Sequence, residues 1–485
     1  MDKPNVLLLM TDEHPVFMAG CYGHRSAKTP ALDRLASQGS IFDAAYCPSP
    51  ICAPSRAAML TERHVHAIEV WDNAAPLRSD WPTFVHSLRH AGYRTILCGK
   101  MHFVGPDQYH GFEERWTQDI YPATFNWTRS NRAAVAVNDG QNIYRIYEAG
   151  PGRTRDMSYD EEVMFRAEYG LRRMLSRGAE KPFFLCVSFT GPHYPYKAPR
   201  EYWDLYTDED VDIPKVPEDY REREHAYVRW LRTHGRFHHI VPDEIARKAR
   251  RAILGRVSLI DDYVSRLLSL LSGNPNSDAA RDTIVIYASD HGDMMGEHGL
   301  WFKNAAYEWS SRVPLIFAGP GIPCRRIPEP VSLLDLGPTL CSLLDIEDLC
   351  AVSDGRDLSG LLRRERPSAE GLAIMENYGE GVWRGWRMIR QGRYKLNYVP
   401  GYDPELFDLE QDPGEWNNIA ADPSCRQVRK RLEQQVLTGW NPDECDERRW
   451  QSEERRLAIM KAIGSGQPAD WQIPSPPVPH PLDYP

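Results

Sequence analysis

The chain has 485 residues, of which 42% are apolar and 26% charged, an ordinary composition for a globular protein with a large core that excludes disordered and fibrous proteins. Its 58 Lys and Arg residues against 68 Asp and Glu residues give a net charge of −10. Binding to a nucleic-acid backbone needs a basic surface, so this charge argues against a nucleic-acid partner. The net charge does not exclude a small anionic ligand, because a binding site is a local arrangement of charges.

The N-terminal apolar run, residues 6–10, is too short for a signal peptide, and no run approaches the ~18 residues of a membrane span. We therefore expect a cytoplasmic protein without a membrane partner. The ten cysteines include no CxxC pair and are too sparse for a disulfide scaffold. We expect most of them to be reduced thiols in the core.

Four apolar runs of strand length each end at polar residues; they span residues 6–10, 95–98, 183–189 and 283–288. Because these runs are continuously apolar, they predict strands buried on both faces, as in a parallel sheet covered by helices. Helical patterns separate them, at residues 30–38, 83–91, 160–175 and 245–271. In such open sheets, ligands bind outside the carboxyl ends of the strands.

The polar residues that follow these strands are candidates for one shared site: Asp12, Lys100, His102, His193, Asp290 and His291. For any one of them, a solvated loop is the simpler interpretation. Taken together, carboxylate oxygens and imidazole nitrogens suit a divalent metal ion, and a lysine suits an anionic ligand. The set therefore predicts a metal and anion site.

Cys52 begins the segment Cys-Ala-Pro-Ser-Arg-Ala-Ala-Met-Leu. Pro54 favours the first turn of a helix, and the alanines that follow are strong helix formers. Cys52 is thus predicted to lie at a helix N-terminus, where backbone N–H groups and the helix dipole stabilise an anion. The alternative is an ordinary cysteine in a loop before a helix.

The pattern Cys52-x-Pro54-Ser55-Arg56 resembles the signature of the type I sulfatases of the alkaline phosphatase superfamily, in which the cysteine is oxidised to formylglycine. The resemblance extends from residue 5 to about residue 418. It implies an alkaline-phosphatase-like α/β/α sandwich with a large, mostly parallel central sheet and a smaller C-terminal α+β subdomain. It also implies a formylglycine-generating enzyme as a partner during maturation.

By this resemblance, one divalent metal ion, Ca²⁺ or Mn²⁺, is bound by Asp12, Asp290 and His291, with Glu13 as a further candidate ligand. The resemblance implies six catalytic residues: Cys52 as the formylglycine nucleophile, Arg56 to orient its hydrate, Lys100 and Lys303 to neutralise sulfate oxygens, His193 to serve the leaving group, and His102 to help release sulfate.

Two positions depart from the common sulfatase pattern, because many sulfatases have Asp where Glu13 stands and Asn where His291 stands. An Asp-His pair is also seen in formylglycine-dependent phosphonate monoester and phosphodiester hydrolases. Such a hydrolase is therefore the alternative function. A non-catalytic sulfate-binding protein with an unmodified Cys52 is the remote alternative.

Segments 72–75, 100–108 and 111–122 resemble the choline sulfatases within this family. Trp127 aligns with the tryptophan that these enzymes place against a trimethylammonium group, a contact worth ~0.5–2 kcal/mol. A core or lid aromatic is the alternative for Trp127. Since residues 129–155 and 379–387 differ from choline sulfatases, we expect a small-molecule sulfate ester similar to choline O-sulfate, or another alkyl, aryl or sugar sulfate.

We expect a catalytic α/β domain over residues 1–365, an α+β subdomain over 366–440 with a hairpin turning at Gln391-Gly392, and a C-terminal tail over 441–485. The proline-rich part of this tail, residues 473–481, is predicted to be extended. It is either a free tail or, as we favour, a segment that contacts a neighbouring subunit of a homo-oligomer, a dimer or tetramer. The charged segment 207–239 is predicted to be an exposed insertion.

Overall fold

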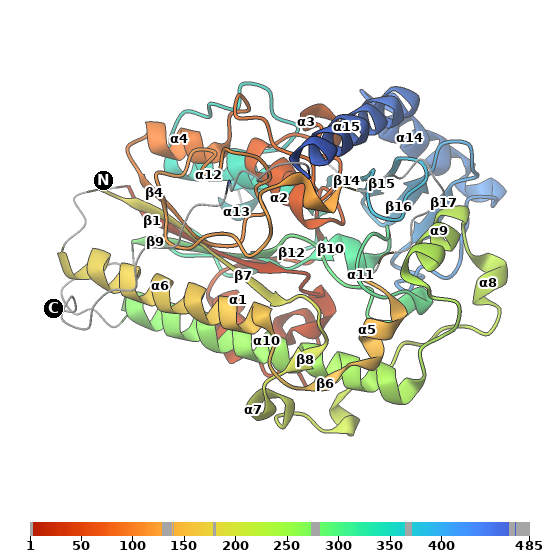
Figure 1. Cartoon of the computed structure of the whole chain (residues 1–485), viewed down its shortest axis with the longest axis horizontal. Coiled ribbons are helices and arrows are strands. Elements are labelled where there is room, and N and C mark those ends of the chain that lie inside the picture. Colours follow the sequence, from red (N-terminus) through yellow and green to blue (C-terminus); the bar gives the residue numbers. More distant parts are fainter. Residues whose placement is uncertain are drawn as a thin grey trace.

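The structure is a computed structural model that describes residues 3–128, 138, 140–177, 181–272, 282–363, 371–464 and 471. Its main element is an eight-stranded sheet in the order β12-β2-β11-β9-β1-β7-β4-β5, covered by helices on both faces (Figure 1). The strands are β1 (Asn5–Asp12), β2 (Ser40–Phe42), β4 (Arg94–Gly99), β5 (Glu114–Arg115), β7 (Phe183–Pro192), β9 (Thr283–Ser289), β11 (Leu315–Ala318) and β12 (Arg325–Ile327). The predicted α/β/α sandwich is confirmed.

The four predicted strands are adjacent and parallel in this sheet. β1 pairs in parallel with β7 on one side and β9 on the other, and β7 pairs in parallel with β4. β11 runs antiparallel to β9 and β2, so the sheet is mostly rather than wholly parallel. Because β1, β4, β7 and β9 run in one direction, the residues that follow them emerge at the same edge.

Both faces of the sheet are buried, which explains the continuously apolar strands. Leu7 and Leu9 of β1 belong to the apolar cluster formed with α1 (Pro30–Gln38), α6 (Arg155–Arg177) and α10 (Asp243–Ser272). Leu8 and Met10 belong to the cluster on the opposite face, which includes residues of α2 (Cys52–Thr61), α4 (Phe84–His90) and α12 (Leu336–Leu344). All four predicted helical patterns lie within α1, α4, α6 and α10 or within one residue of their ends.

A second, four-stranded antiparallel sheet forms the smaller C-terminal part. Its strands, in spatial order, are β14 (Leu372–Asn377), β15 (Trp386–Gln391), β16 (Tyr394–Tyr398) and β17 (Glu405–Asp408), and α14 (Arg426–Val436) packs on β15 and β16. The predicted hairpin is present, but Gln391 pairs with Tyr394, so Gly392 and Arg393 make the turn. Gly392 has φ +54°, a conformation that favours glycine.

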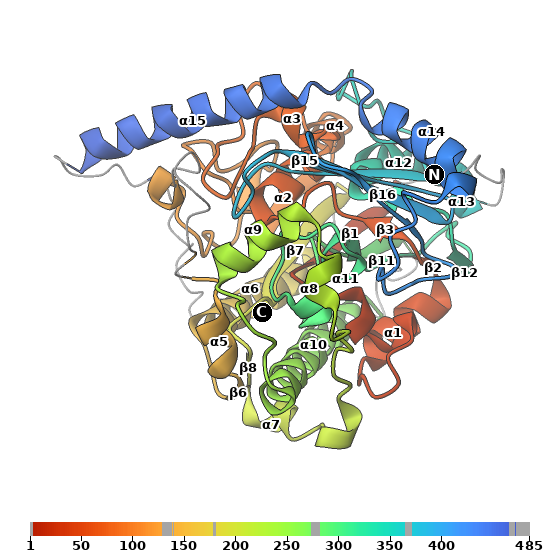
Figure 2. The same cartoon turned by 90° about the vertical axis from the view of Figure 1, so that its right-hand side faces the viewer.

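A long helix, α15 (Pro442–Ile463), occupies the first part of the predicted tail and crosses over α3 (Val65–Ile68), as Figure 2 shows. It is anchored by buried arginines. Arg456 donates from both terminal nitrogens to the Asp72 carboxylate, each at 2.7 Å, and Arg449 donates to the Trp383 carbonyl at 2.6 Å. The proline-rich segment 473–481 lies outside the described residues, so its contact with a neighbouring subunit stays a prediction.

The prediction that residues 207–239 form an exposed insertion holds for residues 207–225, which are mostly exposed or half-buried, and is wrong for the helix that follows. Tyr227, Leu231 and His234 of α9 (Ala226–Gly235) are buried. The spacing of these residues places them on one side of the helix, and the many charges around them hide that pattern in the sequence. His238 and His239 are exposed.

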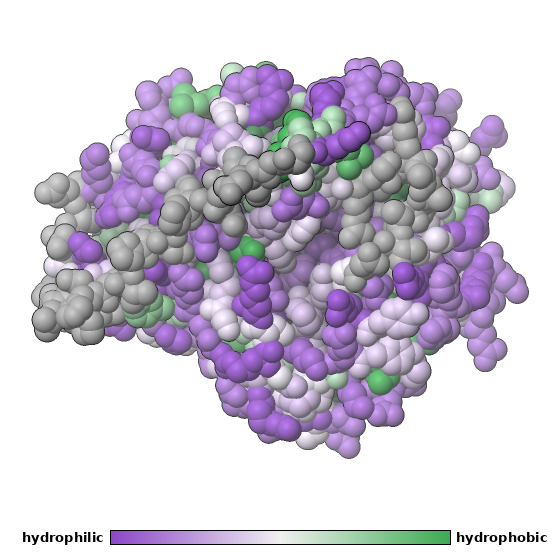
Figure 3. All heavy atoms as spheres, in the orientation of Figure 1, coloured by the Kyte–Doolittle hydropathy of each residue, from purple (hydrophilic) through white to green (hydrophobic). Residues whose placement is uncertain are grey.

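The remaining short helices and strands are α5 (Ile143–Tyr147), α7 (Arg200–Trp203), α8 (Tyr220–Arg223), α11 (Glu308–Ser311), α13 (Ser359–Arg363), β3 (Ala45–Tyr46), β6 (Gly150–Pro151), β8 (Lys197–Ala198), β10 (Arg312–Val313) and β13 (Val331–Ser332). Hydrophilic residues dominate the face seen in Figure 3, and apolar residues form only small groups on it. In the part of the chain that the structure describes, no helix has the length and apolarity needed to cross a membrane.

Candidate active site

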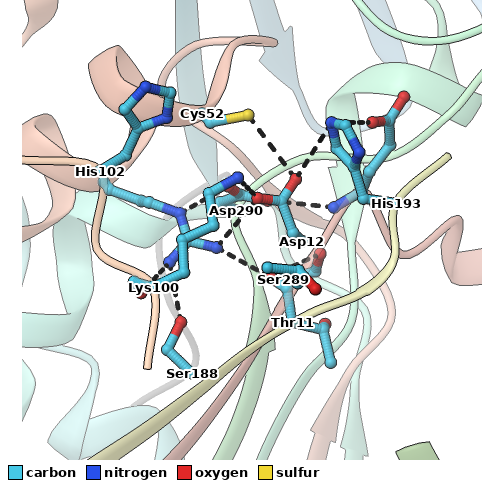
Figure 4. A network of polar contacts seen from close by, with 12 residues as sticks. Thr11, Asp12, Cys52, Lys100, His102, Ser188, His193, Ser289 and Asp290 are labelled. Carbon is cyan, nitrogen blue, oxygen red and sulfur yellow. Dashed lines mark hydrogen bonds and ion pairs between the residues drawn. The ribbon is translucent and has the colours of Figure 1, made fainter. Parts of the chain in front are cut away.

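The polar residues after the four parallel strands converge, as predicted (Figure 4). Asp12 ends β1, Asp290 follows β9, Lys100 follows β4 and His193 follows β7. The ammonium group of Lys100 contacts Oδ2 of Asp12, and His193 Nε2 lies 4.0 Å from Asp12 Oδ1. The parallel topology therefore produces one site from residues that are up to 278 positions apart, 290 − 12.

Cys52 reaches the same site from a different element, as the first residue of α2. Its Sγ atom lies 3.1 Å from Lys303 Nζ, 3.3 Å from His291 Nε2 and 3.6 Å from Asp12 Oδ1. The predicted helix N-terminus is confirmed. Burial raises the pKa of the Cys52 thiol to about 12, so the unmodified side chain is a neutral thiol and a weak nucleophile at neutral pH.

Arg56, one turn into α2, is fully buried and binds the surrounding elements together. Its Nε donates to Asp290 Oδ2 at 2.7 Å, and one terminal nitrogen donates to the Lys100 carbonyl at 2.8 Å and to Ser188 Oγ at 2.9 Å. Burial by itself would raise the pKa of Asp290. The positive charge of Arg56, together with those of Lys100, Lys303 and other nearby groups, outweighs burial and lowers that pKa, so Asp290 is ionised.

Asp12, Asp290 and His291 suit a divalent cation. One potential ligand atom from each, together with Cys52 Sγ, lies within 4.8 Å of the others. His291 Nδ1 lies 3.0 Å from the Gly292 carbonyl oxygen, and the tautomer that donates there directs the Nε2 lone pair toward both aspartates. Burial lowers the pKa of His291 to about 3, which keeps the imidazole neutral as a ligand must be.

Glu13 adds a further oxygen to this group. Its Oε1 atom is buried and has no hydrogen-bond partner among the described residues, which is a costly arrangement for a carboxyl group. Its Oε2 atom lies 2.9 Å from His193 Nε2 and 3.4 Å from Lys303 Nζ. The donor set of carboxylate oxygens and one imidazole therefore fits a cation such as Ca²⁺ or Mn²⁺.

His193 and His102 are both neutral. His193 Nδ1 donates to the Tyr194 carbonyl at 2.7 Å, and its Nε2 lies 3.1 Å from Lys303 Nζ. Both ring nitrogens of His102 are buried without a hydrogen-bond partner in the described part of the chain. Burial lowers the pKa of both imidazoles well below the ordinary value, and nearby lysine charges add to the effect. Each ring is therefore able to accept a proton during a reaction.

Cys52, His102, His193 and Lys303 line a cavity of about 260 Å³ whose other lining residues include aromatic and acidic side chains. Trp127, 41% exposed, lies at the cavity with its ring 4.8 Å from Tyr121 and 5.5 Å from His102. Asp72 and Glu380 bring carboxyl groups to the same cavity.

The sequence interpretation did not identify Asn73, His234 and Glu380 as site residues, although all three line this cavity. Asn73 accepts the N–H of Ala53, the residue after Cys52, at 3.0 Å, and donates to Glu380 Oε1 at 2.6 Å. It thus connects the start of α2 to the cavity wall. Asn73 lies in segment 72–75, whose resemblance to the choline sulfatases was a signal for it, but no local pattern marks His234 or Glu380. Every residue predicted for the site lies in this cluster or at its cavity, while the individual catalytic roles stay predictions.

Comparisons with known proteins agree with this geometry. Residues 4–346 match the family model described as Sulfatase, and residues 296–440 match the model described as N-sulphoglucosamine sulphohydrolase, C-terminal. The choline-sulfatase of Rhizobium meliloti (strain 1021) is 38% identical over 494 residues, which cover 97% of this chain and 93% of that protein.

Two solved structures share the fold. A putative sulfatase from Bacteroides thetaiotaomicron superposes with a TM-score of 0.70 at 26% identity, covering 91% of this chain and 94% of that one. The phosphonate monoester hydrolase of Agrobacterium radiobacter superposes with a TM-score of 0.72 at 24% identity, covering 90% and 95%.

Proposed function

Because the chain belongs to the sulfatase family, we propose that this sulfatase hydrolyses a small sulfate ester with a cationic leaving group, and that choline O-sulfate is its first candidate substrate. One observation carries the proposal. The cavity that contains Cys52 is also lined by Trp127, Tyr121 and Glu380, whereas Asp72, which lines it too, is already paired with Arg456. Aromatic faces and carboxylates are the groups that favour a quaternary ammonium ion.

The nucleophile in this proposal is Cys52 after its oxidation to formylglycine by a formylglycine-generating enzyme. The aldehyde hydrate would supply an oxygen nucleophile that a thiol with a pKa of about 12 does not. The Cys-x-Pro-Ser-Arg pattern at the start of a buried helix supports this assignment. A divalent cation held by Asp12, Asp290 and His291, with Glu13 beside them, would supply Lewis-acid polarisation of a sulfate oxygen.

The chain's own cations would hold the sulfate group. Lys303 Nζ lies 3.1 Å from Cys52 Sγ, and the Lys100 ammonium group contacts Asp12, whose Oδ1 atom lies 3.6 Å from the same sulfur. Burial lowers the pKa of Lys100 to about 7, and an anionic sulfate ester would favour its charged form. Arg56, which follows residue 52 in α2 and binds Asp290, would hold residue 52 in a fixed position relative to Asp290.

The two neutral histidines would carry protons. His193 Nε2 lies 3.1 Å from Lys303 Nζ, so His193 would take a proton from this ammonium group and pass it to the leaving-group oxygen, and Lys303 would regain a proton from solvent. His102 has unpaired ring nitrogens at the cavity and would accept the proton that the nucleophile loses when sulfate is released. In this proposal His193 gives a proton to the leaving group, and His102 accepts a proton when sulfate is released.

The test combines mass spectrometry of residue 52 with a pair of matched substrates. Protein produced in a host with a formylglycine-generating enzyme should contain formylglycine at position 52 and hydrolyse choline O-sulfate. Its kcat/KM should exceed that for the neutral isostere in which a tert-butyl group replaces the trimethylammonium group. An unmodified thiol in active protein would overturn the assignment of formylglycine as the nucleophile. Equal kcat/KM values for the two esters would overturn the preference for a cationic leaving group.

A phosphonate monoester or phosphodiester hydrolase is the second candidate, favoured by the Asp290-His291 pair. Rates on a sulfate ester and a phosphonate ester with the same leaving group separate the two. A higher kcat/KM for the phosphonate would replace the proposal with this alternative.

A further inference from the structure

A second cluster of potential metal ligands lies at the opposite end of α2 from Cys52. Glu62 is the C-terminal cap of α2, and Asp348 and Cys350 lie in the loop after α12. One carboxylate oxygen from each acid and the Cys350 sulfur lie within 4.8 Å of one another. None of these residues belongs to the candidate active site.

Glu62 is the unusual member of this cluster. Its side chain is fully buried, and neither carboxylate oxygen has a partner at hydrogen-bonding geometry among the described residues. It also adopts φ +59°, which is unfavourable for a residue with a side chain. The neighbouring cation, Arg63, instead binds Asp354 at 3.0 Å. Within the described part of the chain, no ion pair reaches Glu62 or Asp348.

The surrounding structure makes room for this carboxyl group. A Cβ atom at Gly337 in α12 would lie 2.1 Å from Glu62 Oε1, so glycine is required where the two elements meet. Asp348 Oδ1 accepts the N–H of Cys350 at 2.9 Å, which holds the loop in place. Burial, reinforced by Asp348, raises the pKa of Glu62 to about 8. A buried carboxyl group without a hydrogen-bond partner is costly beside a second, half-buried acid and a buried thiol, and a divalent cation would remove that cost.

We propose that Glu62, Asp348 and Cys350 form a structural site for Zn²⁺ or a similar thiophilic divalent cation. One sulfur and two oxygen donors suit Zn²⁺, which is bound by four ligands in structural sites. Glu62, Asp348 and Cys350 would supply three of these ligands. On binding, Cys350 releases its thiol proton to solvent and the sulfur coordinates the metal, with no change of oxidation state. The site would hold the end of the helix that begins with Cys52 against the loop after α12.

Cobalt is the probe for this site, because a cobalt–thiolate bond absorbs in the near ultraviolet and cobalt–oxygen bonds do not. The experiment uses the full chain with Cys52→Ser, which removes the thiol of the active site. One equivalent of Co²⁺ should produce the thiolate band. Cys350→Ser should abolish the band, and Glu62→Gln should lower the Co²⁺ affinity by more than about 100-fold. Glu347→Gln, an exposed acid next to Asp348, is the matched control and should change neither.

Thermal unfolding provides a second readout that does not depend on activity. Added Zn²⁺ should raise the Tm of the unsubstituted protein and of Glu347→Gln by the same amount, and should raise the Tm of Glu62→Gln, which keeps only the active-site cation site, by clearly less. Absence of the thiolate band, persistence of the band in Cys350→Ser, or an equal Zn²⁺ effect in Glu62→Gln would each overturn the proposal. In that case Glu62 would be a protonated acid that shares its proton with Asp348.

Discussion

The guanidinium Nε of Arg56 lies 2.7 Å from Oδ2 of Asp290, although the two residues are 234 positions apart. Both side chains are completely buried. Arg56 belongs to the helix that begins with Cys52, and Asp290 follows a central strand of the large sheet. This ion pair therefore sets the position of residue 52 relative to the sheet edge.

Replacing Arg56 should affect both stability and catalysis. Arg56→Ala leaves Asp290 and Asp12 buried without the guanidinium, and we expect the free energy of unfolding to fall by ~3–5 kcal/mol. Arg56→Lys keeps the charge but loses the planar fork, so it should fold and lose sulfatase activity by about 100-fold or more. Urea unfolding and kcat measurements test this. Arg78→Ala, which removes an exposed pair with Asp80, is the control. An unchanged unfolding midpoint in Arg56→Ala would contradict the expectation.

Removal of divalent metal should abolish activity, and Ca²⁺ or Mn²⁺ should restore it. His291→Ala removes the imidazole ligand and should raise the metal concentration needed for half-maximal activity by more than about 100-fold. His291→Asn retains an oxygen donor and should show a smaller increase. Metal titration after chelation measures both variants, with the exposed His90→Ala as control. Full activity after exhaustive chelation would exclude a catalytic metal.

Trp127 should contribute to the binding of a cationic leaving group. A cation–π contact of ~0.5–2 kcal/mol corresponds to a KM for choline O-sulfate that is about 2- to 30-fold higher in Trp127→Ala. Trp127→Phe retains a weaker aromatic face, so its KM for choline O-sulfate should lie between the values for the unsubstituted protein and for Trp127→Ala. The KM for the neutral tert-butyl isostere should change little in Trp127→Ala. Equal losses on both substrates would mean that Trp127 contributes only shape.

The stability contributed by Glu376 should depend on pH. This buried carboxylate accepts from Arg387 Nε at 2.6 Å and from the His66 N–H at 2.9 Å. Burial by itself would raise its pKa, but Arg387 and His66 outweigh burial and lower it below the ordinary 4.5. The folded state therefore binds fewer protons than the unfolded state, and the stabilisation is complete above about pH 4.5 and lost as the pH falls through the lowered pKa.

At pH 7, Glu376→Gln leaves Arg387 buried without its counter-charge and should cost ~3–5 kcal/mol. The difference in Tm between this variant and the unsubstituted protein should shrink as the pH is lowered from 7 toward strongly acidic values. Glu244→Gln, at an exposed helical pair with Lys248, is the control and should show no such trend. A Tm difference that stays constant with pH would show that the effect is steric rather than electrostatic.

Much of the site was predictable because it depends on local patterns. Continuous apolar runs identify the four buried strands, and parallel strands expose their last residues at a common edge. Asp12, Lys100, His193 and Asp290 follow from these two facts. Pro54 and the alanines after it place Cys52 at a helix N-terminus. Each of these signals acts within about ten residues, a range over which side-chain spacing determines which face is buried.

The cavity could not be predicted in the same way. Asn73, His234 and Glu380 come from a loop, from a helix whose apolar side is hidden among charges, and from the turn after β14. The turn of the β15–β16 hairpin also differed by one residue, because the pairing of Gln391 with Tyr394, rather than composition, decides it.

Charge is a further property for which the sequence and the tertiary structure give different information. A net charge of −10 correctly describes the chain as a whole, yet Arg56, Lys100 and Lys303 gather around Cys52. The sequence by itself determined the sheet, the helix that begins with Cys52 and the residues at the strand ends, because these depend on local periodicity. Only the tertiary structure decided the shape and charge of the cavity, because these depend on which distant surfaces pack together.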